Sequence, residues 1–535
     1  MTLEPTACRR DERSFPNHLP VFRLPGAHSD PRRRPHAVRA CGAAQGGRSM
    51  TTPTETGLQM RLGWPALLVL GVAQILGAGV YVLIGTAASL YAGPAVTVSF
   101  VIAGVACLLV GLCYAELSSS VPESGSAYSY CKHTLGIGPA WALGWLLFLE
   151  FSVAASLLAV GFSGYLGSLL GDLGIVLPVA ISTPTIQLLP ATNGASLTVT
   201  GHTNLVAAFA VLCAGAIVAM GTSRSSLANT ILVVVKVLVL VAFITVGATE
   251  VDPANWTPFV PPNEGGFTYG WEGVMRAAAL LFFAFLGFET VSTAAAETRN
   301  PQRDVPIGIL GSLAICATLY VLAAIVLTGL IPFRDLYVPD PIALAVDRIG
   351  WPQFAVVIKI GALAGLASVL LANAFGHSRV CYAMSRDGLL PDLFSRLHPV
   401  RNSLAGANLL LAALAAINAA LLPISVMADL ISFGVALMFA MVAISLIRIR
   451  STEPERIGRF RVPLGGVRLF GIWIGVVPVG AIVLSFAMTL PVALDLMQQA
   501  LAGDLLPVFL LLVYALTGGL IYRFYGRARS RRRTA

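Results

Sequence analysis

The sequence predicts an all-α polytopic membrane protein, on the grounds of its composition, the length of its apolar runs and the charge of its loops. Of the 535 residues, 56% are hydrophobic and only 11% are charged, whereas a soluble protein carries about 25% charged residues. Apolar runs of about 20 residues, the length that spans a bilayer, recur along the chain. One transmembrane domain embedded in a lipid bilayer therefore fits the chain better than a string of soluble domains.

The apolar runs predict twelve transmembrane helices, numbered here as spans 1 to 12. Their approximate limits are 63–90, 94–119, 139–170, 203–221, 227–249, 271–296, 307–331, 352–384, 404–423, 426–447, 469–490 and 505–524. We expect a disordered basic N-terminal tail over 1–60, a transmembrane domain over 61–525 and a basic cytoplasmic tail over 526–535. The N-terminal tail has no apolar signal-peptide core, and Met50 or Met60 is an alternative start of the chain.

Loop charge predicts that both termini lie in the cytoplasm of a multi-pass plasma-membrane protein. With the N-terminus inside, the loops 172–202 and 250–270 fall outside, and neither contains Lys or Arg. Loop 449–468 and the tail after residue 522 fall inside and are rich in Arg. Cytoplasmic loops carry such an excess of positive charge. The net charge of +9 therefore indicates contact with anionic lipid and not with nucleic acid.

Two predicted spans contain glycines that weaken a helix near its middle. Span 1 contains Gly77-Ala78-Gly79, and span 6 contains Phe285-Leu286-Gly287. Freed N–H and C=O groups cannot face lipid, so a broken helix is expected to face a cavity. The two breaks lie five spans apart, which predicts a five-plus-five inverted repeat with a binding site between broken helices 1 and 6. The alternative is that these small residues only allow close helix packing.

The two breaks also provide the groups that bind an α-amino acid. Backbone N–H groups at helix starts carry partial positive charge and suit a carboxylate. Carbonyl groups at helix ends suit an ammonium. An α-amino acid presents both charges on one carbon. The predicted substrate-binding residues are Ile75, Gly77, Ala78, Gly79, Phe283, Ala284, Phe285 and Gly287.

Several motifs resemble the amino acid–polyamine–organocation (APC) superfamily, with the closest similarity to its cationic amino acid transporter family and the bacterial members of that family. The motifs are GAGVYVLIG at 77–85, FFAFLGFETVSTAAAETRNPQRDVPIGI at 282–309, the segment 94–130, VDPANWTPF at 251–259, YAMSRDGLLP at 382–391 and FRVPL at 460–464. The resemblance implies the inverted-repeat fold, secondary transport of amino acids and a cytoplasmic loop over 386–391. Many family members have Ser or Thr where this chain has Ala78.

Lys236 lies near the middle of predicted span 5, among apolar residues. A charge at that depth costs about 2.5–3.5 kcal/mol, so a functional role is the first hypothesis, and snorkelling to water is the alternative. In transporters that resemble this chain, a lysine in span 5 occupies the place of a coupling sodium. The resemblance therefore implies sodium-independent, proton-coupled transport by alternating access. The alternative is an amino acid/polyamine exchanger or facilitator without proton coupling.

Glu150 in span 3 and Glu289 just past the span 6 break are, with Lys236, the predicted ion-coupling residues. Glu150 could pair with a cation or stabilise the core. Glu289 could bind protons or substrate, or it could cap the restarting helix, where an acid is favoured. Lys359 in span 8 is interpreted as a snorkelling residue and Glu116 in span 2 as a structural one.

Other functions and ligands are disfavoured by the sequence. The sequence contains no ring of charges of the kind that lines a channel pore. It also contains no phosphate loop, nucleophile motif or metal-ligand cluster that would indicate an enzyme. The eight cysteines show no CxxC spacing, so we expect no cofactor, metal site or disulfide framework. The mostly apolar stretch 367–373 favours a neutral amino acid, whereas the family resemblance implies a cationic one. The substrate, symport versus exchange and the oligomeric state stay open.

Overall fold

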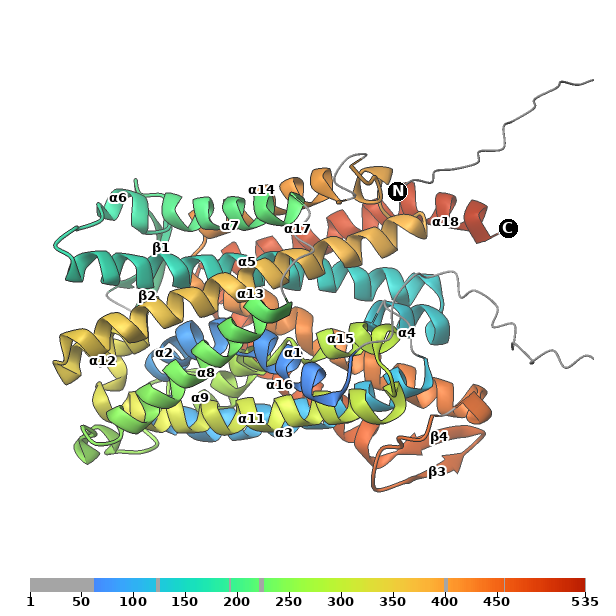
Figure 1. The fold of residues 1–535 in the computed structure, drawn as a ribbon, viewed down its shortest axis with the longest axis horizontal. Coiled ribbons are helices and arrows are strands. Elements are labelled where there is room, and N and C mark those ends of the chain that lie inside the picture. Colours follow the sequence, from blue (N-terminus) through green and yellow to red (C-terminus); the bar gives the residue numbers. More distant parts are fainter. Residues whose placement is uncertain are drawn as a thin grey trace, which may run out of the picture. The chain divides into compact units, whose positions relative to one another are not determined.

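Helices make up most of the structure, a computed structural model drawn in Figure 1. It describes residues 62–121, 126–191, 194–220, 226–398, 403–456 and 458–534. All of these residues belong to one unit, 58–535, and the tail predicted over 1–60 lies almost entirely outside that unit and wholly outside the described residues. Each of the twelve predicted spans overlaps at least one helix.

The helices follow one another closely along the chain. The first half contains α1 (Trp64–Ile75), α2 (Ile84–Ala87), α3 (Val96–Ser120), α4 (Ser126–Leu135), α5 (Ile137–Asp172), α6 (Val179–Ser182), α7 (Leu205–Ala219) and α8 (Ser226–Gly247). The second half contains α9 (Gly270–Phe282), α10 (Phe288–Thr293), α11 (Pro301–Leu330), α12 (Pro341–Ile349), α13 (Pro352–Arg386), α14 (Ala405–Leu421), α15 (Ile424–Thr452), α16 (Val476–Leu501), α17 (Leu506–Ile521) and α18 (Arg527–Thr534). Shorter π-helical and 3-10 segments join several of them.

Two antiparallel hairpins occur, one in a predicted loop and one that overlaps the predicted start of span 11, so the chain is mostly and not wholly helical. β1 (Ile186–Ala191) pairs with β2 (Gly194–Val199), and β3 (Gly466–Leu469) pairs with β4 (Ile472–Gly475). The second hairpin corrects the predicted start of span 11 at residue 469, because α16 begins only at Val476. The apolar residues before it are strand residues, which hydropathy alone does not distinguish from a membrane helix.

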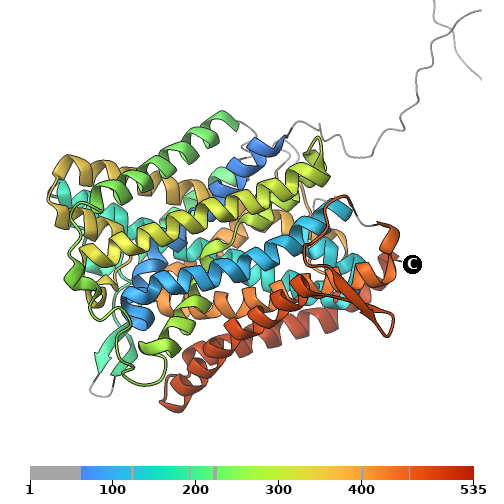
Figure 2. The ribbon, with the colours of Figure 1, turned by 90° about the horizontal axis from the view of Figure 1, so that it is seen from below.

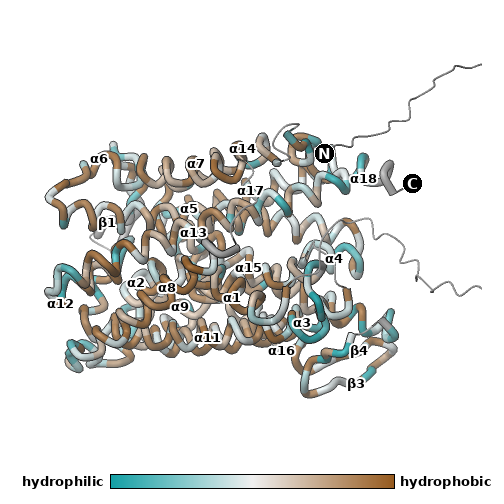
Figure 3. The backbone as a smooth tube through the Cα atoms, in the orientation of Figure 1, coloured by the Kyte–Doolittle hydropathy of each residue, from teal (hydrophilic) through white to brown (hydrophobic). Residues whose placement is uncertain are grey.

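The described part of the chain contains nine helices suited by length and composition to cross a membrane, with the stretch Trp64–Ser120 counted as one. Two shorter apolar helices, α7 and α14, have 15 and 17 residues. Figure 3 shows hydrophobic residues along the long helices. Hydrophilic residues lie at the ends of these helices and in the short helices α4 and α12. The chain is therefore a polytopic membrane protein, while the number of twelve crossings stays a prediction.

The long helices lie in pairs that join the two halves of the chain. α5 lies along α13, α3 along α11 and α7 along α14 (Figures 1 and 2). Other contacts also have a counterpart: α1 packs against α11 as α9 packs against α3, and α8 packs against α13 as α15 packs against α5. Each contact becomes its counterpart when every span is exchanged for the one five places away. The two halves therefore share one core.

Candidate functional site

Span 1 is interrupted inside its predicted glycine cluster. α1 ends at Ile75, and Leu76 has φ −69° and ψ 86°, which lies outside the helical region. The chain resumes with a π-helical segment, Gly79–Leu83, a type of turn that is frequent at functional sites. A Cβ atom added to Gly77 would lie 3.1 Å from Cγ1 of Val369. Glycine therefore leaves room at this turn for a side chain of α13.

Span 6 is interrupted at Leu286 and Gly287. α9 ends at Phe282 and is followed by a 3-10 turn, Phe283–Phe285. Leu286 has an extended ψ of 147°, and Gly287 has φ 119°. Residues with a side chain rarely adopt that φ, so this turn requires glycine. The helix resumes as α10 at Phe288.

The two interruptions cross in direct contact. A Cβ atom added to Gly79 would lie 2.5 Å from the Cβ atom of Ala284, and one added to Gly287 would lie 2.7 Å from the carbonyl carbon of Gln74. Both distances are shorter than a van der Waals contact, so these glycines also allow the close packing that was the alternative reading. Earlier residues of one segment meet later residues of the other. The two segments therefore run antiparallel.

Lys236 binds carbonyl groups that the break in span 1 frees at the end of α1. Its ammonium donates to the carbonyl oxygens of Ala73 and Leu76, the second at 3.1 Å. Its side chain has no exposed surface, so Lys236 does not reach water by snorkelling. A cation is favoured at a helix C-terminus because of the helix dipole. Lys236 therefore stabilises the break through these carbonyl groups, and it does not line the cavity described below.

Two further side chains satisfy backbone groups at the breaks. The hydroxyl of Tyr320, on α11, lies 2.5 Å from the carbonyl oxygen of Ile75 and 3.1 Å from that of Ala284, one from each break. Glu289 accepts a hydrogen bond of 2.8 Å from the N–H of Gly287. Glu289 therefore caps the restarting helix, which is one of its two predicted roles, and ion coupling stays a prediction.

A cavity lies where the two interruptions meet α5 and α13. It is lined by Gln74, Ile75, Gly77, Ala78, Gly79, Glu150, Phe151, Ala154, Leu158, Phe283, Ala284, Leu286, Gly287, Glu289, Thr290, Val369 and Asn373. Every predicted substrate-binding residue except Phe285 is in this lining, and so are two of the three predicted ion-coupling residues. The structure thus brings together residues from four spans.

Phe285 packs into the protein core and does not line the cavity. Its ring centroid lies 6.3 Å from that of Phe100 and 5.3 Å from that of Tyr320, and the side chain is fully buried. In a 3-10 turn of three residues per turn, side chains two positions apart point in different directions. Phe283 therefore reaches the cavity and Phe285 does not.

Two buried oxygens in the cavity lack a hydrogen-bond donor. They are Oε2 of Glu150 and Oδ1 of Asn373, neither of which has a partner among the described residues. Buried acceptors of this kind are rare, so both atoms indicate a donor on a bound molecule or a proton. The sequence analysis missed Asn373, which is a lone amide in an apolar run. Its spacing of four residues from Val369, which also lines the cavity, was the available signal.

Lys359, near the start of α13, is an ion-paired residue, which corrects its interpretation as a snorkelling one. The side chain is fully buried, and its ammonium lies 2.7 Å from a carboxylate oxygen of Asp172 and 2.7 Å from one of Asp347. Asp340, in the loop before α12 and outside the predicted spans, belongs to the same cluster. Burial raises the pKa of Asp340 to about 6, although the charge of Lys359 acts in the opposite direction.

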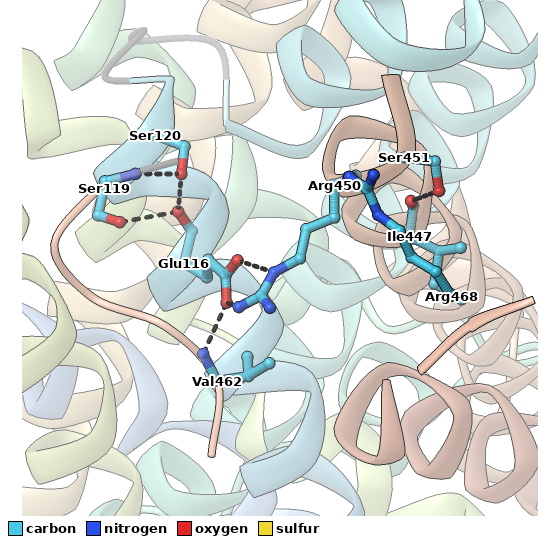
Figure 4. A network of polar contacts seen from close by, with 9 residues as sticks. Glu116, Ser119, Ser120, Ile447, Arg450, Ser451, Val462 and Arg468 are labelled. Carbon is cyan, nitrogen blue, oxygen red and sulfur yellow. Dashed lines mark hydrogen bonds and ion pairs between the residues drawn. The ribbon is translucent and has the colours of Figure 1, made fainter. Parts of the chain in front are cut away.

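Two other ion-paired clusters join helices away from the cavity. Glu116 on α3 binds Arg450 on α15 through both carboxylate oxygens, at 2.5 and 2.6 Å (Figure 4), which agrees with a structural role. Arg276 on α9 is fully buried and pairs with Asp429 and with Asp495, the latter at 2.8 Å. The sequence analysis missed this cluster, although an arginine inside a predicted span was its signal.

The cavity offers backbone groups from two helix breaks, two carboxyl groups and the carboxamides of Gln74 and Asn373 beside apolar walls. In the described ranges, no group of three His, Cys, Asp or Glu side chains is placed to hold a metal ion. The arrangement can bind a small molecule that carries both a donor and an acceptor.

Comparisons with known proteins identify the family. Residues 62–517 match the family model described as amino acid permease. The chain is 40% identical over 413 residues to the branched-chain amino acid permease BcaP of Bacillus subtilis (strain 168), covering 77% of this chain and 85% of the relative. It is 39% identical over 398 residues to the methylthioribose transporter of the same organism, covering 74% and 82%. It is 34% identical over 400 residues to cationic amino acid transporter 4 of Homo sapiens, covering 74% and 60%. These names point to a transporter that is not an enzyme, and the chain belongs to the amino acid permease family of the APC superfamily.

Proposed function

We propose that this chain is a secondary active transporter that moves amino acids across the plasma membrane by alternating access, without sodium and with proton coupling. One observation carries the proposal: two antiparallel interrupted helices border a cavity, and Lys236 occupies the carbonyl oxygens at the end of α1. Interrupted helices at membrane depth are how many transporters bind their substrates. The relatives named as transporters agree with this reading.

The twelve crossings and the five-plus-five inverted repeat are part of the proposal. The pairs α3–α11, α5–α13 and α7–α14 each join a span to its counterpart five places later. A pseudo-two-fold axis in the membrane plane generates such pairs, together with the matched contacts α1–α11 and α9–α3. The antiparallel crossing of the two breaks is also what halves of opposite orientation require.

The proposed orientation has both termini in the cytoplasm. Its support is the Arg-rich loop 449–468 on one side and the loop 172–202 without Lys or Arg on the other. A membrane-impermeant thiol reagent tests it on intact cells, with the parent protein as background. Val199→Cys in β2 should react from outside, and Gln302→Cys at the start of α11 should react only after permeabilisation. The reverse pattern would contradict the orientation.

The substrate class we favour is a neutral amino acid, with cationic amino acids as the second class. The amino and carboxyl groups would bind at the breaks, while the side chain lies against Phe151, Leu158 and Val369. Apolar walls suit an apolar side chain, and the carboxyl group of Glu150, with its unpartnered Oε2, is the feature that would accept a cationic one. A competition panel of the twenty amino acids and polyamines against a labelled substrate distinguishes the two classes.

The size of the cavity provides a sharper test of substrate placement. A Cβ atom added to Gly77 would lie 3.1 Å from Val369 and 3.4 Å from Leu158. Gly77→Ala should therefore weaken competition by leucine or isoleucine more than competition by glycine or alanine. An equal loss for small and large amino acids would argue against this position for the substrate side chain.

We assign ion coupling to Lys236, Glu150 and Glu289. Lys236 occupies carbonyl oxygens of the type that coordinate sodium in transporters with interrupted helices. This placement supports transport without sodium. Glu150 and Glu289 line the cavity, where each carboxyl group can exchange a proton while the substrate is bound.

Purified protein in proteoliposomes tests this assignment. Substrate should accumulate when the outer solution is acidic and contains no sodium. Lys236→Met should abolish this accumulation and leave exchange of internal for external substrate. Lys359→Met is the matched control, because it removes another fully buried lysine that lies outside the cavity. A requirement for sodium would overturn the assignment. Unimpaired accumulation in Lys236→Met would favour an exchanger or facilitator in which Lys236 only stabilises the break.

A further inference from the structure

The β3–β4 hairpin exposes an apolar face. Antiparallel pairing puts alternate residues of the two strands on the same side. One side carries Val467, Leu469, Ile472 and Ile474, whose exposed fractions are 66%, 51%, 51% and 41%. A continuous apolar patch rimmed by polar residues marks an interaction surface.

The turns at the two ends of β3 carry exposed apolar residues in a left-handed conformation. Leu464 has φ 64° and Phe470 has φ 50°, and each precedes a glycine with positive φ. Tight turns of this kind favour Asn, Asp or Gly, and a bulky residue there is strained. Phe470 is nevertheless 97% exposed and Leu464 is 75% exposed. Packing within the described chain does not offset this strain, so both side chains are suited to a contact outside the fold.

The opposite face of the hairpin packs against the end of α15, which in turn is ion-paired to α3. The guanidinium of Arg450 lies 4.1 Å from the ring centroid of Trp473, and the N–H of Trp473 donates to Ser451 at 2.9 Å. Figure 4 shows that Glu116 binds Arg450 and also accepts the N–H of Val462, at 2.6 Å. These contacts fix which face of the hairpin meets the protein. The apolar face is therefore turned outward.

The hairpin lies at the edge of the membrane-crossing region. β4 leads directly into α16, which is suited to cross a membrane. Val476, Val483 and Phe486 on this helix are 58%, 58% and 53% exposed, as expected for side chains that face lipid. Figure 2 shows the hairpin projecting beside the end of α16. Its apolar face therefore adjoins the surface that lipid covers.

The segment that contains the hairpin carries positive and no negative side-chain charge. No Asp or Glu occurs between residues 457 and 494. The arginines in this stretch are Arg459, Arg461 and Arg468. Arg459 also lines a surface pocket with Arg299 and Arg303, and no carboxylate in the described part of the chain pairs with these three pocket arginines. Unpaired guanidinium groups at a membrane surface attract anionic headgroups.

We propose that the β3–β4 hairpin inserts Phe470 and its apolar face into the headgroup–acyl boundary of the adjacent leaflet, where the neighbouring arginines bind the phosphates of anionic phospholipids. Apolar and aromatic side chains beside basic ones are the features of interfacial membrane anchors. Through Trp473 and Arg450, the anchor connects the ends of α3 and α15 to the lipid surface. The inference concerns lipid binding and does not depend on which substrate is carried.

Fluorescence depth measurements test the insertion. Phe470→Cys is labelled with an environment-sensitive nitrobenzoxadiazole fluorophore, corrected for labelling of the parent protein, and reconstituted into phosphatidylcholine–phosphatidylglycerol vesicles. Emission should shift to shorter wavelength, and nitroxides near the headgroup or upper acyl chain should quench it. Arg396→Cys, at an exposed position in the loop between α13 and α14, is the matched control and should show neither effect. Identical behaviour at both positions would overturn the proposal. A shift without quenching by lipid-borne nitroxides would indicate a protein contact, such as a second copy, and would overturn it too.

Vesicles of different charge test the arginines. With labelled Phe470→Cys, adding phosphatidylglycerol to phosphatidylcholine vesicles should increase quenching. The increase should disappear when Arg459→Gln and Arg461→Gln are added together. Arg348→Gln, an exposed arginine in the last turn of α12, is the control and should retain it. An increase that survives the double substitution would show that these arginines do not bind the anionic headgroups.

Discussion

The two helix interruptions are stabilised in different ways. In span 1 the partner comes from another helix, because Lys236 of α8 donates to the carbonyl oxygens of Ala73 and Leu76. In span 6 the partner is local, because Glu289 accepts the N–H of Gly287 two residues earlier. The first break is therefore coupled to the position of α8, whereas the second keeps its own hydrogen bond when neighbouring helices move. A conformational change that displaces α8 would alter the first break and spare the second.

The largest expected effect comes from removing the left-handed residue of span 6. Gly287→Ala combines φ 119° with a Cβ atom 2.7 Å from a backbone carbon of Gln74, and no flexible side chain can relieve the overlap. We expect loss of uptake and a destabilisation of about 2–4 kcal/mol, measured by thermal unfolding in detergent. Gly171→Ala is the control, because nothing lies within 4 Å of an added Cβ atom. Normal uptake by Gly287→Ala would contradict the rigid second break.

Glu289→Gln tests whether the second break needs a charge or only an acceptor. The amide oxygen can still accept the N–H of Gly287, so the protein should remain folded. Proton-driven accumulation should fall to equilibration if Glu289 exchanges a proton, as proposed. Glu289→Ala removes the acceptor as well and should also destabilise the protein by about 1–3 kcal/mol. Full accumulation by Glu289→Gln would show that Glu289 acts only as a helix cap.

Tyr320→Phe removes a hydroxyl that contacts both breaks. Loss of its hydrogen bond to the carbonyls of Ile75 and Ala284 should destabilise the protein by about 1 kcal/mol and lower uptake moderately. Tyr514→Phe is a matched control, because its hydroxyl donates to a carbonyl, that of Trp145, away from the breaks. The control should lose similar stability and keep its uptake. An equal loss of uptake in both variants would trace the effect to general stability.

The smallest effect is expected at Asp340. Its titration changes the stability of the protein with pH, and this change must be distinguished from the effect of pH on Glu289. Burial raises the pKa of Asp340 to about 6, above the value of the unfolded chain. Protonation of such a carboxyl favours the folded state. Its stabilisation is complete below the unfolded pKa and is lost as the pH rises through about 6. Asp340→Asn should therefore flatten the pH dependence of the melting temperature between about pH 4 and pH 7, and an unchanged slope would contradict this.

The positions of the breaks could be predicted from the sequence, because few residues other than glycine fit them. Gly287 is required by its φ and Gly79 by a backbone contact. Both requirements select glycine, so they are visible in the sequence. The sequence does not show which groups a buried charged residue will bind. Lys236 and Lys359 look alike in the sequence, yet one binds carbonyl oxygens and the other binds two carboxylates. Their partners come from distant segments of the chain.

Local geometry explains the other errors. The sequence predicts Phe285 as a substrate-binding residue because it lies beside the break, but a 3-10 turn places Phe283 and Phe285 on different sides. The sequence predicts that span 11 begins at residue 469, because mean hydropathy does not detect the alternation of exposed and buried residues. Residues 472–475 alternate between exposed and buried, as in a strand with one covered face. Hydropathy therefore finds apolar stretches and does not decide what covers them.

The pairing of Glu116 with Arg450 has a consequence for the biosynthesis of the protein. Arg450 follows Glu116 by 334 residues, so a ribosome that adds about 5–20 residues per second reaches it on the order of tens of seconds later. During that interval the carboxylate of Glu116 has no guanidinium beside it, and an unpaired charge does not stay in hydrocarbon. The end of α3 therefore stays at the membrane–water interface until α15 is inserted. The packing of this end of the helix bundle is then a late event in the maturation of the nascent chain.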